Sequence, residues 1–330
     1  MSLPAVTVVI PVWNGRGLLM TLLEKLRAQT YPIAEVIAVD NGSEDGAPEA
    51  AASFGARVLR LGSNRGFAAA VNHGVEACRT EALALVNSDV EPEPEWLERL
   101  ARALSADDVW FATGRILSAA HRDCIDGTYD LISRAACAWR VGQGRPDGPV
   151  YSQARPIAMA PATAALFRAE LFRRVGPFDT VFESYLEDVD FGIRCALAGL
   201  SGAYVPDAVA YHWGSASFGA WNPEVVELIA RNQSYLVAKH YSPSLRLRYW
   251  WPILVGQLLW GVVALRHRRG VAFCKGKLAA RRHPHPARAP DSSSGLAAIL
   301  EQSERQLRDA QRDRPDWYWR VYFLLTSLED

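Results

Sequence analysis

Residues 6–12, VTVVIPV, form a nearly continuous apolar run rich in β-branched side chains, which is typical of a strand buried on both faces of a sheet. Beyond it, leucines recur at helical spacing at Leu18, Leu19, Leu22, Leu23 and Leu26. Further strand-like runs lie at 36–39, 57–61 and 82–86, and a helical segment lies at 67–78. This alternation predicts an α/β fold with an open, mostly parallel, Rossmann-like sheet flanked by helices.

Three of these predicted strands end in polar residues: Trp13-Asn14, Asp40-Asn41 and Asn87-Ser88-Asp89. In open α/β sheets, ligands bind beyond the carboxyl ends of the strands. Each polar group taken alone is also consistent with a simple turn, because Asp and Asn are common turn formers. The three together favour a binding cleft along one rim of the sheet.

Two common nucleotide-binding motifs are absent. A dinucleotide-binding domain needs GxGxxG directly after the first strand, whereas residues 15–20, GRGLLM, lack the third glycine. No GxxxxGK[ST] motif occurs anywhere in the 330 residues. The five cysteines include no CxxC pair, and their spacing fits neither a zinc site nor a disulfide framework. The first residues lack a signal-peptide pattern, so we expect a reducing, cytoplasmic environment.

Carboxylates are concentrated in the segment 183–190, ESYLEDVD, at Glu183, Glu187, Asp188 and Asp190. Placing so many carboxylates together costs electrostatic free energy unless some are neutralised, solvated or used as a base. The simpler interpretation is that they complement the dipole of a helix over 189–198. Asp89, at the end of a buried strand, suits a Mg²⁺ or Mn²⁺ ion that holds a diphosphate. His212 has either a structural or a ligand role by this reasoning.

Six segments in order resemble the family 2 glycosyltransferases, inverting enzymes with the GT-A nucleotide-diphospho-sugar transferase fold. The similarity is strongest to the rhamnosyltransferase-like branch of bacterial polysaccharide biosynthesis. The segments are VTVVIPVWNG (6–15), VIAVDNGSEDG (36–46), NRGFAAAVNHG (64–74), LALVNSDVEPEPEWL (83–97), VGPFDTVFESYLEDVDFGIRCALAG (175–199) and VPDAVAYHWGSASF (205–218). The resemblance implies a GT-A catalytic domain over 1–220.

The resemblance also implies roles for individual residues. It implies a donor nucleotide site formed by Pro11, Val12, Trp13, Asp40, Asn64, Arg65, Gly66, Asn87 and Ser88. Asp89 matches the last carboxylate of the metal-binding DxD motif, and His212 matches a further metal or diphosphate ligand. The cofactor implied is Mn²⁺ or Mg²⁺. The first Asp of DxD is Asn87 here, so the metal site has fewer formal charges than in many relatives.

The catalytic residues implied by the resemblance lie in the acidic segment. Asp188 matches the general base, Glu187 would position it, and Asp190 would pair with an arginine such as Arg194. We also expect 158–167 to form a strand beneath the donor sugar. The loop-rich segment 124–156 lies where related enzymes admit the acceptor.

An uncharged run of 17 residues at 249–265, YWWPILVGQLLWGVVAL, follows the catalytic region. A membrane-spanning helix needs about 20 apolar residues, and Pro252 shortens this run further. Trp250, Trp251 and Trp260 favour the membrane–water boundary. We therefore expect a segment that lies in the interface or packs on the catalytic domain, with an ordinary buried helix as the alternative.

Charge is distributed unevenly although the chain holds 36 Lys and Arg against 36 Asp and Glu. Residues 228–290 contain twelve basic residues and no acidic ones, which leaves 24 basic and 36 acidic residues elsewhere. Each basic residue near an anionic leaflet contributes about 1 kcal/mol to binding. Because the block adjoins a Trp-rich apolar run, an anionic membrane surface suits it better than nucleic acid. We expect 221–330 to be a helical, membrane-associated region with a linker at 286–296 and an amphipathic helix over 301–325.

The sequence therefore predicts an inverting, metal-dependent glycosyltransferase at the inner face of the plasma membrane. It would transfer a sugar from dTDP-rhamnose or a UDP-hexose to a glycan or polyprenyl-linked glycan acceptor in cell-surface polysaccharide synthesis. The alternatives are a catalytically inactive nucleotide-sugar-binding protein, which the Asn87 departure would suit, and a membrane-peripheral scaffold.

Overall fold

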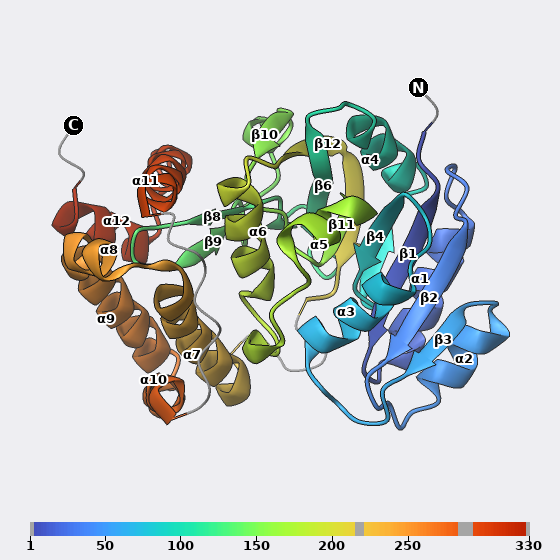
Figure 1. Cartoon of the computed structure of the whole chain (residues 1–330), viewed down its shortest axis with the longest axis horizontal. Coiled ribbons are helices and arrows are strands. Elements are labelled where there is room, and N and C mark those ends of the chain that lie inside the picture. Colours follow the sequence, from blue (N-terminus) through green and yellow to red (C-terminus); the bar gives the residue numbers. More distant parts are fainter. Residues whose placement is uncertain (1–2, 215–220, 283–292, 328–330) are drawn as a thin grey trace.

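The apolar runs of the N-terminal half form neighbouring parallel strands of one ten-stranded sheet (Figure 1). The computed structural model describes residues 3–214, 221–282 and 293–327. The main path of the sheet runs β10-β12-β6-β11-β4-β1-β2-β3, while β5 pairs with β12 and β7 pairs with β6. The strands are β1 (Val6–Val12), β2 (Glu35–Asp40), β3 (Arg57–Arg60), β4 (Ala82–Val86), β5 (Val90–Pro92), β6 (Val109–Ser118), β7 (Ile125–Gly127), β10 (Arg155–Ile157), β11 (Ala164–Arg168) and β12 (Ser201–His212).

Helices cover both faces of this sheet. The side chains of Val6, Val8 and Ile10 pack with α1, α2 and α4, whereas Val9 points to the opposite face, with α3, α5 and α6. The helices of this half are α1 (Arg16–Arg27), α2 (Ala47–Ser53), α3 (Phe67–Ala77), α4 (Trp96–Leu104), α5 (Ala169–Val175) and α6 (Glu187–Leu197). The alternating orientation along β1 explains why the run is apolar throughout, since both of its faces are covered. The predicted α/β sheet is confirmed.

The strand expected over 158–167 is shorter than predicted. Only Ala164–Arg168 form β11, which lies antiparallel between β4 and β6. Pro161 lies in the preceding, non-strand part of this run. Proline lacks the N–H that a central strand needs, which accounts for the late start of β11.

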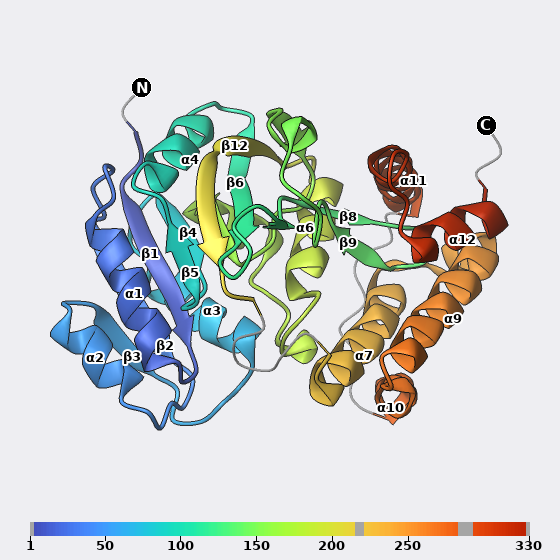
Figure 2. The same ribbon diagram turned by 180° about the vertical axis from the view of Figure 1, so that it is seen from behind.

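The segment 124–156 is a set of short strands rather than open loop. Within it, β8 (Asp130–Ile132) and β9 (Ala138–Arg140) form a two-stranded hairpin outside the main sheet. This hairpin lies between the sheet and the C-terminal helices (Figure 2). It therefore contacts both the part of the chain that carries the sheet and the C-terminal helices.

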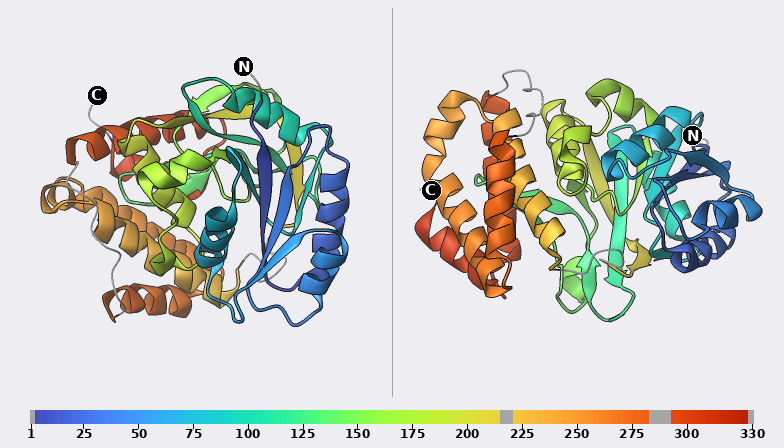
Figure 3. Two further views of the ribbon diagram at one scale, coloured as in Figure 1. Left: turned by 45° about the vertical axis from the view of Figure 1, so that its right-hand side comes forward. Right: turned by 90° about the horizontal axis from the view of Figure 1, so that it is seen from below.

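Six helices make up the described part of the C-terminal region, and they gather on one side of the sheet (Figure 3). They are α7 (Pro223–His240), α8 (Pro243–Arg248), α9 (Trp250–Arg266), α10 (Gly270–Arg282), α11 (Ser293–Ala310) and α12 (Trp317–Leu325). The prediction of a single helix over 301–325 is wrong. This segment belongs to two helices, α11 and α12, and Pro315 lies between them. Proline cannot continue a helix, which explains the break.

The predicted linker and the predicted domain boundary lie mainly outside the residues that the structure describes. Residues 286–292 of the linker lie outside the described residues, while 293–296 belong to α11. The boundary expected after residue 220 adjoins 215–220, which are also outside them.

The apolar run 249–265 packs on the protein along one side of α9. The buried side chains include Val255 and Ala264, and a Cβ added at Gly256 would lie 2.4 Å from that of Ala135. Gln257 donates a hydrogen bond from Nε2 to the Ala135 carbonyl oxygen (2.9 Å). Among the described helices, none is both long and apolar enough to cross a bilayer.

Candidate functional site

Strand pairing brings Asp89 and His212 together at one rim of the sheet. His212, the last residue of β12, lies opposite Val90 in the antiparallel pair with β5. Its Nε2 is 3.2 Å from Oδ1 of Asp89. On its other side, Nδ1 lies 2.8 Å from Oδ2 of Asp126, which belongs to β7. Strands β12 and β7 and the turn that precedes β5 thus hold one imidazole between two carboxylates.

The two carboxylates govern the charge of His212. Burial alone would lower the pKa of the imidazole, but Asp126 and Asp89 outweigh it and raise the pKa of His212 to about 9. Burial likewise opposes ionisation of Asp126, yet its hydrogen bond to His212 lowers the pKa of that carboxyl. A carboxylate on Nδ1 fixes the orientation of the ring and leaves Nε2 directed at Asp89.

The chemistry of this rim fits a divalent metal held jointly with a diphosphate. Asp89 offers one oxygen, and His212 offers one nitrogen close to it once Nε2 has given up its proton to the incoming ion, while Oδ1 of Asn87 is buried without a hydrogen-bond partner among the described residues. The described residues contain no cluster of three His, Cys, Asp or Glu that could enclose an ion by itself. Mg²⁺ commonly takes only one or two protein ligands and completes its coordination with substrate phosphates and water.

Asp188 lies in the first turn of α6. Its Oδ1 accepts from the backbone N–H of Val189 (2.9 Å), and its Oδ2 accepts from that of Ala162 (3.2 Å). The Nη2 of Arg140, on β9, lies 3.6 Å from the same Oδ2. These contacts hold a carboxylate that keeps 12% of its side-chain surface exposed, so it remains reachable by a substrate.

Arg140 is the centre of a group of acidic side chains. It also pairs with Asp130 (Nε to Oδ1, 3.3 Å) and donates to Oγ1 of Thr163 (3.2 Å). Burial raises the pKa of Asp130 to about 6; Asp188 adds to the rise and Arg140 opposes it. Asp126 also interacts electrostatically with Arg140. Sequence reasoning missed Asp126, Asp130 and the role of Arg140, because no motif marks them and they come from the irregular segment 124–156.

Glu187 differs from Asp188 although the two are adjacent in the chain. Glu187 is buried, and its Oε2 finds no hydrogen-bond partner among the residues that the structure describes. Burial, reinforced by the neighbouring Asp188 carboxylate, raises the pKa of Glu187 well above its usual range. The environment therefore favours a neutral acid at this position.

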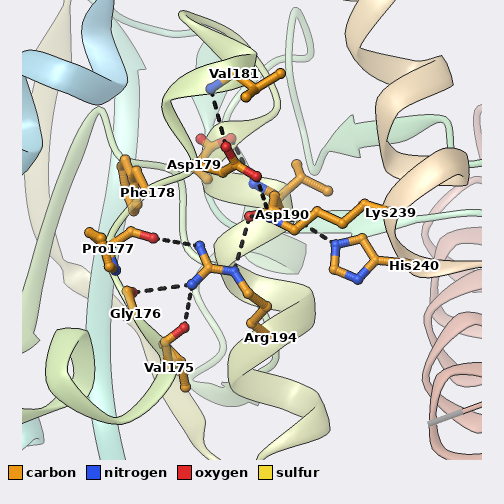
Figure 4. A network of polar contacts seen from close by, with 12 residues as sticks. Val175, Gly176, Pro177, Phe178, Asp179, Val181, Asp190, Arg194, Lys239 and His240 are labelled. Carbon is orange, nitrogen blue, oxygen red and sulfur yellow. Dashed lines mark hydrogen bonds and ion pairs between the residues drawn. The ribbon is translucent and has the colours of Figure 1, made fainter. Parts of the chain in front are cut away.

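Asp190 faces away from the acidic rim and anchors a buried ion network (Figure 4). The expected pair with Arg194 is present (Nε to Oδ2, 3.0 Å). Lys239 and His240 of α7 also contact Asp190, each at 2.8 Å. Lys239 additionally pairs with Asp179 (2.7 Å). Asp190 thus joins α6 to the first tail helix.

The residues expected to bind the nucleotide lie along the adjoining strand ends. Asp40 is buried, and its Oδ1 accepts from the Ser43 N–H (2.8 Å). Asn41 donates to Oδ1 of Asn64 (2.9 Å) and accepts from the N–H of Arg65 (2.8 Å), so it ties the loop 64–66 to the end of β2. Pro11, Trp13 and Ser88 are partly buried, whereas the Val12 side chain packs in the core beneath the rim.

The loop 64–66 also contacts the acidic segment. Gly66 has φ +86°, and a Cβ there would lie 2.9 Å from the Glu183 backbone. The next residues donate to the same segment: Phe67 N–H to Ser184 Oγ (3.1 Å) and Ala68 N–H to the Glu183 carbonyl oxygen (2.9 Å). This close approach requires glycine at position 66.

The fold is that of the GT-A glycosyltransferases, as two solved structures indicate. The crystal structure of GalNAc-T7 with UDP, GalNAc and Mn²⁺ matches with a TM-score of 0.66 at 13% identity, over 95% of this chain and 58% of that one. The mannosyltransferase PcManGT from Pyrobaculum calidifontis, in complex with GDP-Man and Mn²⁺, matches with a TM-score of 0.54 at 18% identity, over 98% and 86%.

Residues 7–176 match the family model "Glycosyl transferase family 2", and the chain belongs to that family. It is 32% identical to the pre-mycofactocin glycosyltransferase of Mycobacterium tuberculosis over 63% of this chain, and the match spans only 42% of that protein. It is 28% identical to the N-acetylglucosaminyl-diphospho-decaprenol L-rhamnosyltransferase of the same organism, over 74% of this chain and 85% of that protein.

Proposed function

We propose that this glycosyltransferase moves a sugar, with inversion, from a dTDP-rhamnose or UDP-hexose donor to a glycan or polyprenyl-linked glycan acceptor in cell-surface polysaccharide synthesis. The observation that carries the proposal is the contact of the loop 64–66 with the acidic segment that leads to Asp188. Through it, the loop assigned to the donor nucleotide contacts residues 183 and 184 of the segment that leads to Asp188, the carboxylate assigned to the acceptor. The rhamnosyltransferase relative, whose name specifies a decaprenol-linked substrate, supports a lipid-linked acceptor.

In this proposal, Asp188 acts as the general base. Its partly exposed carboxylate accepts the proton of an acceptor hydroxyl, which attacks the anomeric carbon opposite the leaving diphosphate. General-base help of this kind is worth roughly 10²–10⁴ in rate. Asp89 and His212 would hold a Mn²⁺ or Mg²⁺ ion, which neutralises charge on the leaving diphosphate when bound. Arg140 lies beside Asp188 and would keep its carboxylate oriented.

We also propose that the C-terminal helices attach the enzyme peripherally to the anionic inner face of the plasma membrane. Exposed basic side chains support this at Arg246, Arg248, Arg266, Arg268, Lys275, Arg281 and Arg282. Two members of the basic block, Arg231 and Lys239, are buried and paired with Glu183 and with Asp179 and Asp190. They are not available to lipid, and Arg288 lies outside the described residues.

The substitution Asp188→Asn tests the function directly. We expect it to abolish transfer and to leave the stabilisation by UDP, dTDP or GDP with Mn²⁺ nearly unchanged, because Asn keeps the shape but cannot take the proton. Thermal shifts with and without Mn²⁺ identify the nucleotide, and chelator measures metal dependence. Near-normal turnover by the variant, or no metal-dependent stabilisation by any nucleotide in the wild type, would contradict the proposal and favour a scaffold.

A further inference from the structure

Exposed apolar side chains are concentrated in the C-terminal helices. Of the fifteen large apolar side chains exposed in the described part of the chain, twelve lie between Leu247 and Leu325. Five of them lie three or four positions apart along α9 and so share one face of that helix. This α9 ridge consists of Trp250, Leu254, Leu258, Val262 and Leu265. The opposite side of α9 packs on the protein, so the ridge is the more exposed side of this helix, with side chains that are 42% to 65% exposed.

A cavity of about 390 Å³ opens beside the ridge, among α7, α9 and α10. Its apolar wall includes Leu254 and Leu258, which also belong to the ridge, together with Phe273. Its polar lining comes from Ser234, Gln257, Lys277 and Arg281. One continuous surface therefore joins an apolar wall to a small group of hydrogen-bonding and cationic side chains.

Lys277 is an ammonium group without an acidic partner. Its Nζ donates to Oε1 of Gln257 and to Oγ of Ser234 (3.2 Å), and lies 3.5 Å from Oε1 of Gln233. In the described structure, no carboxylate lies within ion-pairing distance of it. Enclosure costs free energy, and burial lowers the pKa of Lys277 to about 8.

Two enclosed cations of the tail are neutralised: Arg231 pairs with Glu183 (2.7 Å), and Lys239 pairs with Asp190 (2.8 Å). Arg269 and Arg308, like Lys277, have no carboxylate partner among the described residues. Of these three cations, Lys277 is the one that lines the cavity beside the exposed α9 ridge. An anion that enters the cavity would supply the missing charge, and its apolar part would cover Leu254 and Leu258.

We propose that this cavity binds the headgroup of an acidic membrane phospholipid. The phosphate accepts hydrogen bonds from Lys277 and Arg281, and the acyl chains lie along the α9 ridge. The acid-free stretch 228–290 provides charge complementarity to an anionic leaflet. A free phosphate would satisfy the cation but leave the apolar wall exposed, which favours a lipid. The inference rests on the membrane attachment proposed above and adds a defined lipid site to it.

The test uses monomeric short-chain lipids, because these create no charged surface. We expect dihexanoyl phosphatidylglycerol, titrated calorimetrically below its micelle-forming concentration, to bind at least ten times more tightly than dihexanoyl phosphatidylcholine or inorganic phosphate. Lys277→Met should weaken phosphatidylglycerol binding at least tenfold. Lys275→Met removes the same charge from an exposed position of α10 and should change it less than twofold.

Three results would overturn the lipid site: equal effects of the two lysine substitutions, equal binding of the two lipids, or binding of phosphate as tight as that of phosphatidylglycerol. The ridge is tested separately by Leu265→Glu, which alters a side chain that is 65% exposed and does not line the cavity, and so should not disturb folding. This variant should lose at least tenfold in binding to vesicles of 30% phosphatidylglycerol in phosphatidylcholine, and unchanged binding would contradict the role of the ridge.

The failure of this site is distinguishable from failure of the proposed enzyme function. Metal-dependent stabilisation by nucleotide and transfer to a water-soluble acceptor analogue do not involve Lys277, so both should persist in Lys277→Met. If they persist and the wild type ignores acidic lipid, the lipid site alone is wrong. If the nucleotide effect is absent from the wild type while lipid binding depends on Lys277, the enzyme proposal fails and the lipid site stands.

Discussion

Glu187 and Asp188 occupy successive positions at the start of α6, yet their carboxyl groups have opposite surroundings. Asp188 accepts two backbone hydrogen bonds and lies 3.6 Å from Arg140. Oε2 of Glu187 has no hydrogen-bond partner among the described residues, and burial together with the Asp188 carboxylate raises the pKa of Glu187. The surroundings of Glu187 therefore favour its neutral form.

This contrast predicts that Glu187→Gln retains most transfer activity, within about threefold of the wild type. Glutamine has the shape of a neutral glutamic acid and keeps the packing around Asp188. Steady-state kinetics on Glu187→Gln and Asp188→Asn side by side measure the difference. A loss in Glu187→Gln as large as that in Asp188→Asn would mean that Glu187 works as an ionised group.

The Asp130 carboxyl predicts how activity depends on pH. Its pKa of about 6 means that the group loses its charge as the pH falls through 6. Arg140 then has one carboxylate partner fewer and holds Asp188 more tightly, which competes with the acceptor hydroxyl for that carboxylate, so kcat should fall on the acid side of about pH 6. The substitution Asp130→Asn leaves position 130 uncharged at every pH.

In Asp130→Asn, we therefore expect a several-fold lower kcat at pH 7.5 and a weaker pH dependence near 6 than in the wild type. A pH–rate profile under saturating donor measures both. If the inflection near pH 6 persists unchanged in the variant, another group causes it.

Among the helices, α7 forms direct hydrogen bonds with the acidic segment. The Asn232 amide donates to the carbonyl oxygens of Phe182 (2.8 Å), Ser184 (2.9 Å) and Tyr185 (2.7 Å). In the same segment Glu183, Tyr185 and Leu186 have φ between 60° and 69°. Such conformations cost about 1–3 kcal/mol each and persist only where surrounding contacts enforce them. The segment before Asp188 therefore depends on a tail helix for its shape.

We predict that Asn232→Asp lowers the free energy of unfolding by about 3 kcal/mol, because it replaces a donor by a carboxylate that faces three carbonyl oxygens. Transfer should also fall at least tenfold under conditions where the variant is folded, since Asp188 follows this segment. Chemical denaturation and kinetics measure the two effects.

Asn222→Asp provides the matched control, because Asn222 caps the same helix by accepting from the Glu224 N–H (2.9 Å). Aspartate caps a helix equally well, so this variant should behave like the wild type. Equal behaviour of the two variants would argue against control of the acidic segment by α7.

At the scale of the whole molecule, local sequence patterns predicted the helices and strands, whereas the side-chain pairs between distant residues are visible only in the structure. The apolar run of β1 and the Asp190–Arg194 pair, four positions apart on one helix, could be read from spacing. Arg231 looked like part of a membrane-facing basic block, yet it pairs with Glu183, 48 residues earlier. Asp126 reaches His212 across 86 residues. No local periodicity encodes such pairs, because tertiary packing alone brings them together.

The ion network around Asp190 joins α6 to α7, the first of the C-terminal helices. Asp190 is fully buried, and its carboxylate contacts Arg194, Lys239 and His240. Burial opposes its ionisation, but the hydrogen bond from His240 and the charges of Arg194 and Lys239 outweigh burial and lower its pKa. A carboxyl whose folded pKa is lowered stabilises the fold above its unfolded value of about 4, and this contribution is lost as the pH falls below that.

Removal of one member of such a network leaves buried charges without compensation, which typically costs about 3–5 kcal/mol. We therefore expect Asp190→Asn to lower the free energy of unfolding by that amount at pH 7. The difference from the wild type should shrink as the pH falls below 4, because the unfolded wild-type chain then takes up a proton at Asp190 that the folded chain does not bind until the pH reaches its lowered pKa. Denaturant titrations at several pH values measure both effects.

Glu170→Gln is the control, because Glu170 forms an ion pair with Arg174 in which both side chains are about half exposed. Exposed pairs of this kind contribute about 0–1 kcal/mol, so this variant should stay close to the wild type throughout. The contacts that Lys239 and His240 make with Asp190 join α7 to α6, the helix that begins with Glu187 and Asp188. A loss in Asp190→Asn no larger than in Glu170→Gln would therefore mean that other contacts hold the tail helix against α6.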